Sequence, residues 1–533
     1  VNCRHAHTGI WHYRIRDAWF QYKFNIFHFS HLFSLQRVAA KHILTIRCLL
    51  IRMKLIFPLS VLLLAADQFN AEALSFRMAT FRKGLGLGRG RRPDLPKSTY
   101  EDIAIIMTNQ DQSMTSDVIK NDTEGASIPN EIFNLVKSIM GAAIFTLPAG
   151  MASFANSPSA VIPTSALLLF LGLLSGYCFS LIGRVCAYTG ATSYKDAWAK
   201  SVSERTSWIP NLSSLCTTMQ AIVAYSIVLS STFPQLLATA GITWASRTQS
   251  LFFITIFVLL PLCLMKTLSA LAPFSVIGLG GLLYTASVMA IRFLDGSYAP
   301  GGFFFQQMEE LKRPHFGPSL NLLSPAIFLL ASRIGNAYMA HYQAPKMYQE
   351  LRNKTIPRFQ RVVTISYGIV FLCYTTISSL GFLTFGGSSS TFVLNNYATN
   401  DSLLSGSRLA IFLSLMFSYP LTFVSFRANI MDFIGIGSEM KNKPKVVNAF
   451  TVGLLSLITV IAYFVTDIGN LLSFGGATYA NWLTFLYPTF MFLQCAKRMP
   501  KLRNEVPAVV FTLLVGLVLS AIGTKQFIVS TLL

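Results

Sequence analysis

Charged side chains are scarce in this sequence and make up only 12% of its 533 residues. Soluble globular proteins carry roughly 25%, so the composition excludes an ordinary soluble enzyme. Apolar residues contribute 53% of the chain. A chain with this balance needs lipid as the solvent for much of its surface, so we expect an integral membrane protein in contact with the lipid bilayer.

Acidic residues are rarer than basic ones, because 43 Lys and Arg face only 22 Asp and Glu, which gives a formal net charge of +21. A strongly basic chain can be a nucleic-acid-binding protein. Here most basic residues beyond residue 130 lie between long apolar runs, which is the pattern of membrane topology. We expect no nucleic-acid partner.

Paired cysteines and catalytic motifs are absent from the sequence. The eight cysteines are scattered without a Cys-x-x-Cys pair, and most lie in or beside apolar runs, where cysteine behaves as a small apolar residue. They predict neither a metal site nor a disulfide framework. A nucleophile elbow, an H-E-x-x-H motif and paired carboxylates at the head of a pocket are also missing. We therefore expect no enzyme, and no cofactor is implied. A membrane-embedded enzyme is kept as a third alternative, after the two interpretations given below.

The first part of the chain differs from the rest. It begins with Val1, and six of the eight histidines lie within the first 42 residues, so we regard its start as a doubtful upstream segment. Met53 begins a signal-like leader that ends near Ala73, although a chance apolar patch explains it equally well. A basic and polar region, expected to be flexible, follows the leader. With the transmembrane domain, the expected segments are residues 1–52, 53–73, 74–129 and 130–533.

Long apolar runs fill the sequence from residue 130 onward. Eleven of them are long enough, at 1.5 Å per residue, to cross about 30 Å of hydrocarbon as helices. The alternating pattern of a β-barrel is absent, and helices satisfy their own backbone hydrogen bonds in lipid. We therefore expect an all-α, multi-pass membrane protein. The expected spans are 130–154, 159–186, 211–240, 248–266, 270–293, 321–349, 356–386, 406–434, 446–466, 471–495 and 505–527.

The loops between these spans carry an orientation signal. The loops after the even-numbered spans hold 18 Lys and Arg, and the loops on the other side hold 6. Because cytoplasmic loops are enriched in basic residues, we expect a cytoplasmic N-terminus, although a cleaved leader would reverse the first span. The membrane is the plasma membrane or an internal one, such as that of a vacuole or plastid. The Asn400 sequon falls on the non-cytoplasmic side, where glycosylation is possible.

Two of the expected spans contain helix-breaking residues at corresponding positions. The first span joins Gly141 to Pro148, and the sixth joins Gly335 to Pro345. Breaks in spans 1 and 6, one in each half of five, are typical of an inverted-repeat transporter with its binding site at the membrane midplane. The freed N–H groups suit a carboxylate and the freed carbonyls suit a cation. The alternative is that Gly and Pro are merely tolerated for packing.

Several motifs in these spans resemble those of the amino acid/auxin permease family, within the amino acid–polyamine–organocation superfamily. The resemblance covers roughly residues 130–495, and five motifs occur in the family's order. The matching residues are Asn134, Gly141, Ile144, Leu147 and Pro148 in span 1; His341, Pro345, Tyr348, Glu350 and Leu351 in span 6; LGFLTFG at 380–386; SYPL before Arg427; and DIGNLLSFGGATYANWLTFLYP at 467–488.

The resemblance implies a leucine-transporter-type fold with eleven transmembrane helices, arranged as a 5+5 inverted repeat plus one extra helix. It further implies a secondary active amino acid transporter that works by alternating access, with an amino acid as substrate and Na⁺ or H⁺ as the coupling ion. The alternative is a non-transporting amino acid sensor that uses the same pocket and signals through its N-terminal region.

Candidate site residues follow from the breaks and from the resemblance. The peptide groups of span 1 are expected to bind the substrate carboxylate, and span 6 is expected to contact its side chain. The resemblance implies that Asn134 and Ser418 help to hold a sodium ion, and Ser414 lies one turn from Ser418 on the same helix face. The substrate candidates are Gly141, Ala142, Ala143, Ile144, Ile334, Gly335, Asn336 and Tyr338.

Lys137 departs from the family pattern, because sodium-coupled relatives often have a polar neutral residue at this position. A lysine here could place a tethered ammonium where sodium would otherwise bind, which would make transport proton-coupled or ion-independent. The alternative is a lysine that extends to the cytoplasmic interface.

Other polar residues in these spans have two interpretations each. Arg333 could pair with a substrate acid or with Glu131, or it could fix the helix bundle internally. His341 could relay protons or cap a freed carbonyl, and Tyr419, like Tyr338, could line the pocket. Glu350 is expected to be structural, and residues 193–202 are expected to form an amphipathic connector.

Overall fold

The computed structural model describes residues 125–265, 274–317, 324–441 and 443–532. The expected upstream segment, the leader and the basic region up to residue 124 lie outside the described residues. In the described part, every regular element is a helix, and the β-type pairing is limited to two isolated bridges. The all-α prediction is therefore confirmed for this part of the chain.

Seven helical stretches of the described residues are long and apolar enough to cross a membrane, and one bent pair of helices raises the number to eight. The expected spans at 270–293, 321–349 and 471–495 also coincide with helical segments, but these are shorter or interrupted. The count of eleven spans therefore stays a prediction. The seven stretches are Pro158–Thr189, Glu204–Thr239, Arg247–Leu264, Ile356–Phe385, Ser402–Phe433, Pro444–Phe464 and Pro500–Ser530.

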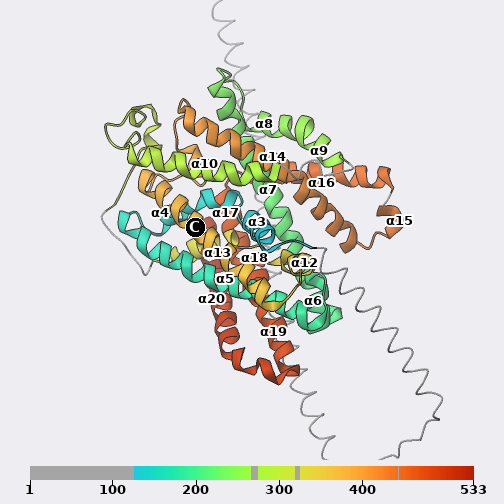
Figure 1. Cartoon of the computed structure of the whole chain (residues 1–533). Helices are drawn as coiled ribbons and strands as arrows, with labels where there is room; N and C mark the ends of the chain where they lie inside the picture. Colours follow the sequence, from blue (N-terminus) through green and yellow to red (C-terminus); the bar gives the residue numbers. More distant parts are fainter. Residues whose placement is uncertain (1–124, 266–273, 318–323, 442, 533) are drawn as a thin grey trace, which may run out of the picture. The chain divides into compact units, whose positions relative to one another are not determined.

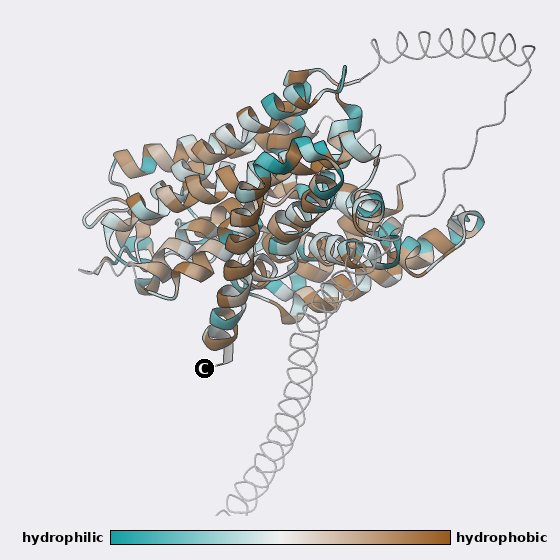
Figure 2. Ribbon diagram, turned by 90° about the horizontal axis from the view of Figure 1, so that it is seen from below, coloured by the Kyte–Doolittle hydropathy of each residue, from teal (hydrophilic) through white to brown (hydrophobic). Residues whose placement is uncertain are grey.

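Hydrophobic residues recur along the ribbons of these helices (Figure 2), and many of their large apolar side chains are exposed. Leu173 and Phe257, for example, are 65% and 66% exposed. Many polar side chains are instead buried between the helices, among them Gln220 at 3% exposure. Apolar surfaces of this extent are rare on water-soluble proteins, so the bundle has the surface of a membrane protein.

The first span is broken as the sequence predicts. Helix α3 (Ile128–Ile139) ends two residues before Gly141, a short 3₁₀ helix η1 (Ala142–Thr146) follows, and α4 (Leu147–Phe154) continues the span. The two parts are bent by 44°. Pro148 lies in the first turn of α4, where its missing N–H costs no helical hydrogen bond.

The sixth span is broken in the same manner. Helix α11 (Ile327–Ala337) stops before a short non-helical stretch, and the 3₁₀ helix η8 (His341–Gln343) leads into α12 (Ala344–Glu350). Pro345 lies in the first turn of α12. Both predicted breaks are therefore confirmed.

The broken spans lie among long helices (Figure 1). Helix α7 (Trp208–Thr239) packs along α14 (Ser402–Phe433), and α14 also packs along α10 (Phe274–Leu294). Helix α13 (Ile356–Phe385) contacts both α5 (Val161–Thr189) and α3. Helix α7 also contacts η1 at the break of span 1.

The tenth expected span has a break that the sequence did not predict. It is divided into α17, the one-turn α18, a π-helical turn η10 and α19, and α17 packs closely against α11. The bounds of these and the other helices are α6 (Tyr194–Ser201), α8 (Arg247–Ile254), α9 (Leu260–Leu264), α15 (Ser438–Lys441), α16 (Pro444–Phe464), α17 (Ile468–Ala477), α18 (Tyr479–Asn481), η10 (Trp482–Leu486), α19 (Tyr487–Arg498) and α20 (Val506–Leu532).

Candidate substrate site

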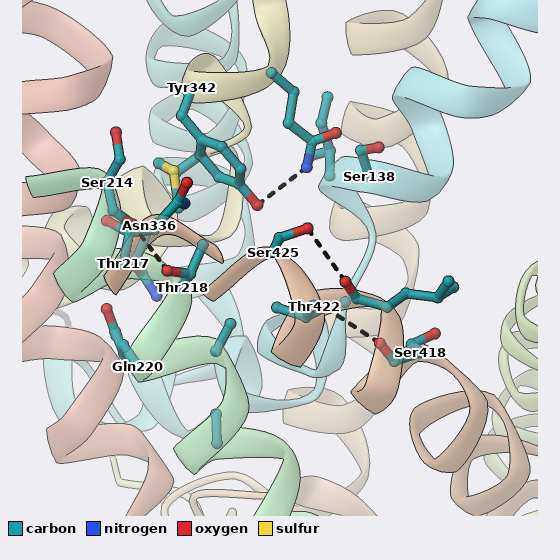
Figure 3. Close-up of a pocket in the computed structure, with 18 of the residues that line it drawn as sticks. Ser138, Ser214, Thr217, Thr218, Gln220, Asn336, Tyr342, Ser418, Thr422 and Ser425 are labelled. Atoms are coloured by element: carbon teal, nitrogen blue, oxygen red, sulfur yellow. Dashed lines mark hydrogen bonds between the residues drawn. The ribbon is translucent and has the colours of Figure 1, made fainter. Parts of the chain in front are cut away.

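A cavity of about 860 Å³ lies where the breaks of spans 1 and 6 meet α7 and α14 (Figure 3). Its wall is built largely from small residues and from uncharged polar side chains. Such a wall offers many hydrogen-bonding groups to a small polar solute. The uncharged polar lining residues are Ser138, Ser193, Tyr194, Asn211, Ser214, Thr217, Thr218, Gln220, Tyr225, Asn336, Tyr342, Gln343, Ser418, Thr422, Ser425 and Asn429.

The cavity has its mouth on one side of the bundle. Lys195 at the start of α6, Lys346 in α12 and Asp432 near the end of α14 all line it. Lys195 follows the second expected span, and Lys346 and Asp432 lie near the ends of the sixth and the eighth. Among the described residues, none from the opposite loops at 295–317 and 386–401 lines the cavity.

Packed rings and hydrogen bonds close the opposite side. Phe145 of η1 packs edge-to-face against Phe392 of the loop before α14, with ring centroids 5.5 Å apart. Both side chains are almost fully buried. Beyond them, Arg292 donates two hydrogen bonds of 2.8 Å to the Asp401 carboxylate, which also accepts a 2.9 Å bond from the Tyr298 hydroxyl.

Backbone hydrogen bonds join the two broken spans near the start of α3 and the end of α12, on the side of the cavity mouth. The N–H of Ala126, two residues before α3, donates to the Glu350 carbonyl at 2.8 Å, and the N–H of Arg352 donates to the Ala126 carbonyl at 3.0 Å. Ala126 and Leu351 thereby form a parallel β-bridge. The bridge links the start of α3 to the end of α12.

Four of the eight expected substrate residues line the cavity, namely Gly141, Ala142, Ala143 and Asn336. Ala142 and Ala143 begin η1. Amides in the first turn of a helix have no partner within that helix, so these two N–H groups suit a carboxylate.

The other four expected substrate residues, Ile144, Ile334, Gly335 and Tyr338, lie outside the lining of the cavity. Ile144 and Ile334 are fully buried. The Tyr338 ring packs between Tyr367 and Tyr374, at centroid distances of 5.9 and 5.0 Å. Its hydroxyl is directed at Gly172 of α5, where only a residue without a side chain leaves room for it.

Three of the four expected ion-coupling residues meet at a second, smaller cavity of about 80 Å³. Lys137, Ser414 and Ser418 line it, together with Tyr225 and residues of α10. Lys137 and Ser418 line the large cavity as well. Asn134 is exposed and lines neither cavity. The structure therefore places Lys137, and not Asn134, on the small cavity that the two serines border.

The remaining polar candidates have structural partners. Arg333 donates through Nε to the Ser473 hydroxyl at 2.8 Å, and no ion pair joins it to Glu131 among the described residues. The buried His341 ring contacts the carbonyl of Ser175, in the interior of α5, at 3.0 Å through Nε2, so this contact caps no carbonyl freed by a break. Tyr419 contacts the Ser226 hydroxyl at 3.2 Å and does not line the cavity.

Two further residue groups behave as the sequence suggests. Lys346 and Glu350 form an exposed ion pair of 3.6 Å on α12. The expected connector forms α6, and its Tyr194 and Trp198 side chains are buried. The Tyr194 hydroxyl donates to the Leu483 carbonyl at 2.9 Å, so α6 is fixed to the break of the tenth span.

Sequence reasoning missed the polar faces of α7 and α14. On α7, the lining residues Asn211, Ser214, Thr218, Ala221 and Tyr225 recur at steps of three and four. On α14, Ser418, Thr422, Ser425 and Asn429 do the same. This spacing places the residues on one face of each helix, and it could have been read from the sequence as a polar stripe within an apolar span.

The fold and the cavity define a multi-pass membrane protein with an internal site of a size suited to a small solute. The family described as transmembrane amino acid transporter protein matches residues 124–529, and the chain belongs to this family. The resemblance that the motifs of spans 1 and 6 suggest is therefore confirmed.

Curated relatives cover most of the same region. The chain is similar to amino acid transporter AVT6E of Arabidopsis thaliana, with 23% identity over 76% of this chain and 84% of the relative. It is also similar to vacuolar amino acid transporter 2 of Saccharomyces cerevisiae, with 20% identity over 76% and 84%. Sodium-coupled neutral amino acid symporter 2 of Danio rerio shares 24% identity over 70% of this chain and 76% of the relative.

Proposed function

We propose that this protein is a secondary active amino acid transporter that works by alternating access. One observation carries the proposal: the large cavity meets both helix breaks and reaches only one side of the described bundle. A site that is open to one side at a time is what alternating access requires. Transport of amino acids also agrees with the names of the relatives.

The breaks supply groups for both ends of a zwitterion. The amides at the start of η1, from Ala142 and Ala143, bind the carboxylate, since the positive end of the helix dipole also lies there. Asn336 at the break of span 6 faces the same space. The side chain of the substrate then lies against α7 and α14, whose uncharged polar residues set the selectivity.

The proposal includes the eleven-span arrangement of five plus five helices and one extra helix. The matching breaks in spans 1 and 6 support it, as does the single cavity that residues of both breaks line together with α7 and α14. The N-terminus is cytoplasmic according to the basic loops, so the mouth of the cavity faces the cytoplasm and the structure is inward-open. A vacuolar membrane, the plasma membrane and a plastid membrane all suit this orientation.

Coupling is the second part of the proposal. Lys137 acts as a tethered cation beside Ser414 and Ser418, in place of a bound sodium ion, and transport is driven by a proton gradient. The small cavity supports this role, because Lys137 borders it together with both hydroxyls while Asn134 does not. The competing role, a lysine that extends to the interface, predicts no effect of Lys137 on coupling.

The test is the flux of labelled amino acids into proteoliposomes that contain the purified full chain, with sodium and proton gradients imposed separately. We expect saturable uptake that depends on the imposed proton gradient and not on sodium. Ala143→Phe fills the cavity at the break and should abolish uptake. Ala508→Phe lies on the exposed face of α20 and is the matched control.

Each other outcome has a distinct meaning. Binding without flux would identify the sensor, whose signalling should then depend on residues 74–129. Uptake that requires sodium would contradict the role of Lys137 but not transport itself. Flux that Ala143→Phe leaves unchanged would place the substrate elsewhere and overturn the site.

A further inference from the structure

The hydroxyl side chains of α7 follow a common pattern with one exception on the cavity wall. Ser214 and Thr218 each donate to the carbonyl four residues earlier, at 2.9 and 3.1 Å, and Ser226 does so at 3.1 Å. Such bonds satisfy hydroxyls inside a helix. Thr217 is 2% exposed, and its hydroxyl has no hydrogen-bond partner among the described residues.

Thr217 lies on the part of the wall that a bound solute would touch. Thr217 and Thr218 both line the large cavity (Figure 3). At about 100° per residue, they flank the helix face that carries Ser214 and Ala221. Ser214 and Ala221 line the cavity as well, and the small side chain of Ala221 leaves space beside the two threonines.

Contacts with α17 fix the part of α7 that carries Thr217. Gln220, one turn further along the same helix, donates its side-chain amide to the Leu471 carbonyl at 3.1 Å. Gly475 packs against the Gln220 amide so closely that a β-carbon would overlap it. This part of α7 is therefore fixed at a set distance from α17.

A buried hydroxyl without a partner is unfavourable, because it has lost its bonds to water and gained none in return. A ligand group that donates or accepts a hydrogen bond removes this cost. Rotation about χ1 exchanges the Thr217 methyl and hydroxyl between staggered positions, so the hydroxyl can turn towards a bound side chain.

The charged residues that line the cavity belong to other elements than α7 and α17. Lys137 lies on α3 and borders both cavities. Lys195, Lys346 and Asp432 are at the mouth. An ionised substrate side chain next to Thr217 would therefore be buried without a counter-charge, which is strongly unfavourable. An uncharged polar side chain is the group that fits.

We propose that Thr217 hydrogen-bonds the side chain of the transported amino acid and thereby selects uncharged polar side chains over apolar ones of the same shape. The inference rests on the proposed transport function and on the carboxylate binding at the break of span 1. Threonine and valine, or asparagine and leucine, are the substrate pairs that differ mainly in hydrogen bonding.

The experiment measures kcat/KM for threonine and for valine in proteoliposomes that contain the full-length protein. We expect the wild type to prefer threonine by about tenfold or more, because a site that pairs with a substrate hydroxyl disfavours the analogue without it. Thr217→Val should bring the ratio close to one. Thr217→Ser keeps the hydroxyl and should keep the preference.

Thr218→Val is the matched control. Thr218 lines the same cavity, but its hydroxyl already has an acceptor, since it lies 3.1 Å from the Ser214 carbonyl and 3.0 Å from the Leu215 carbonyl. Its replacement should lower the rates of both substrates alike and leave their ratio unchanged.

The outcomes separate the inference from the function it rests on. If no amino acid is carried by the wild type, the proposed function fails. If the wild type carries valine as well as threonine, or prefers glutamate or lysine, the selectivity is wrong although transport stands. If Thr217→Val keeps the wild-type ratio, or Thr218→Val loses it, Thr217 is not the selecting residue.

Discussion

The Tyr374 hydroxyl lies 2.7 Å from the carbonyl oxygen of Ala337, the last residue of α11. The same hydroxyl lies 3.0 Å from the carbonyl oxygen of Ile139, the last residue of α3. A hydroxyl has one proton and can donate to one carbonyl at a time. One buried side chain of α13 therefore lies between the ends of both interrupted helices and can donate to either of them.

Removal of this hydroxyl should impair both stability and turnover. We expect Tyr374→Phe to lower the free energy of unfolding by about 1–3 kcal/mol, because a buried carbonyl loses its donor. The transport rate should fall more than the substrate affinity, since the two breaks are no longer linked. Thermal unfolding in detergent and initial uptake rates measure the two effects.

Tyr367→Phe is the control for this prediction. The Tyr367 hydroxyl is also buried on α13, but it is 3.4 Å from the Tyr338 carbonyl, at the limit of a hydrogen bond. The change should therefore cost less. Equal losses in the two variants would show that Tyr374 has no special connection to the breaks.

The Lys137→Asn variant should still transport amino acids, but a different ion should drive the transport. The amide restores a neutral ligand beside Ser414 and Ser418, both of which border the same small cavity as Lys137. We expect uptake to become sodium-dependent and to lose its response to an imposed proton gradient. Lys195→Asn, at the mouth of the cavity, should leave both dependences as in the wild type. A Lys137→Asn variant with no sodium dependence and an unchanged pH profile would exclude the tethered cation.

Tyr338→Phe should leave transport unchanged. The Tyr338 hydroxyl is buried against α5 without a hydrogen-bond partner among the described residues, and it lies away from the cavity lining. Removal of this hydroxyl should leave the melting temperature unchanged or raise it, because an unpaired buried hydroxyl is unfavourable. Asn336→Ala, which removes an amide from the cavity wall, should reduce uptake. A selective loss of substrate affinity in Tyr338→Phe would return this residue to the site.

The sequence predicted the breaks because their signals are local. Gly141 and Pro148 act on the backbone of their own segment, and so do Gly335 and Pro345. The orientation of Tyr338 was not predictable in this way. It depends on space at Gly172, which is far from Tyr338 in the sequence.

The third break, in the tenth span, also depends on distant contacts. The Ser520 and Thr524 hydroxyls of α20 donate to the Ala477 carbonyl, at 2.9 and 3.4 Å, where α17 ends. Pro488 lies in α19, after the π-helical turn, and gives no local signal at residue 478. Gly475 and Gly476, just before the end of α17, are a local signal that the sequence analysis did not use, and the contacts from α20 add to it.

The contact between α17 and α11 leads to the last prediction. A β-carbon at Gly476 would overlap the carbonyl oxygen of Ser332 and come within 3.1 Å of the Asn336 side chain. Gly476→Ala must therefore move α17 away from the break of span 6, and we expect a loss of about 1–3 kcal/mol in stability together with most of the uptake. Gly453→Ala has open space around its β-carbon on α16, so it should leave uptake unchanged and should not lower the stability. Thermal unfolding and flux measurements on the two variants test this prediction. A fully active Gly476→Ala protein would mean that the close packing of α17 against α11 is not required for transport.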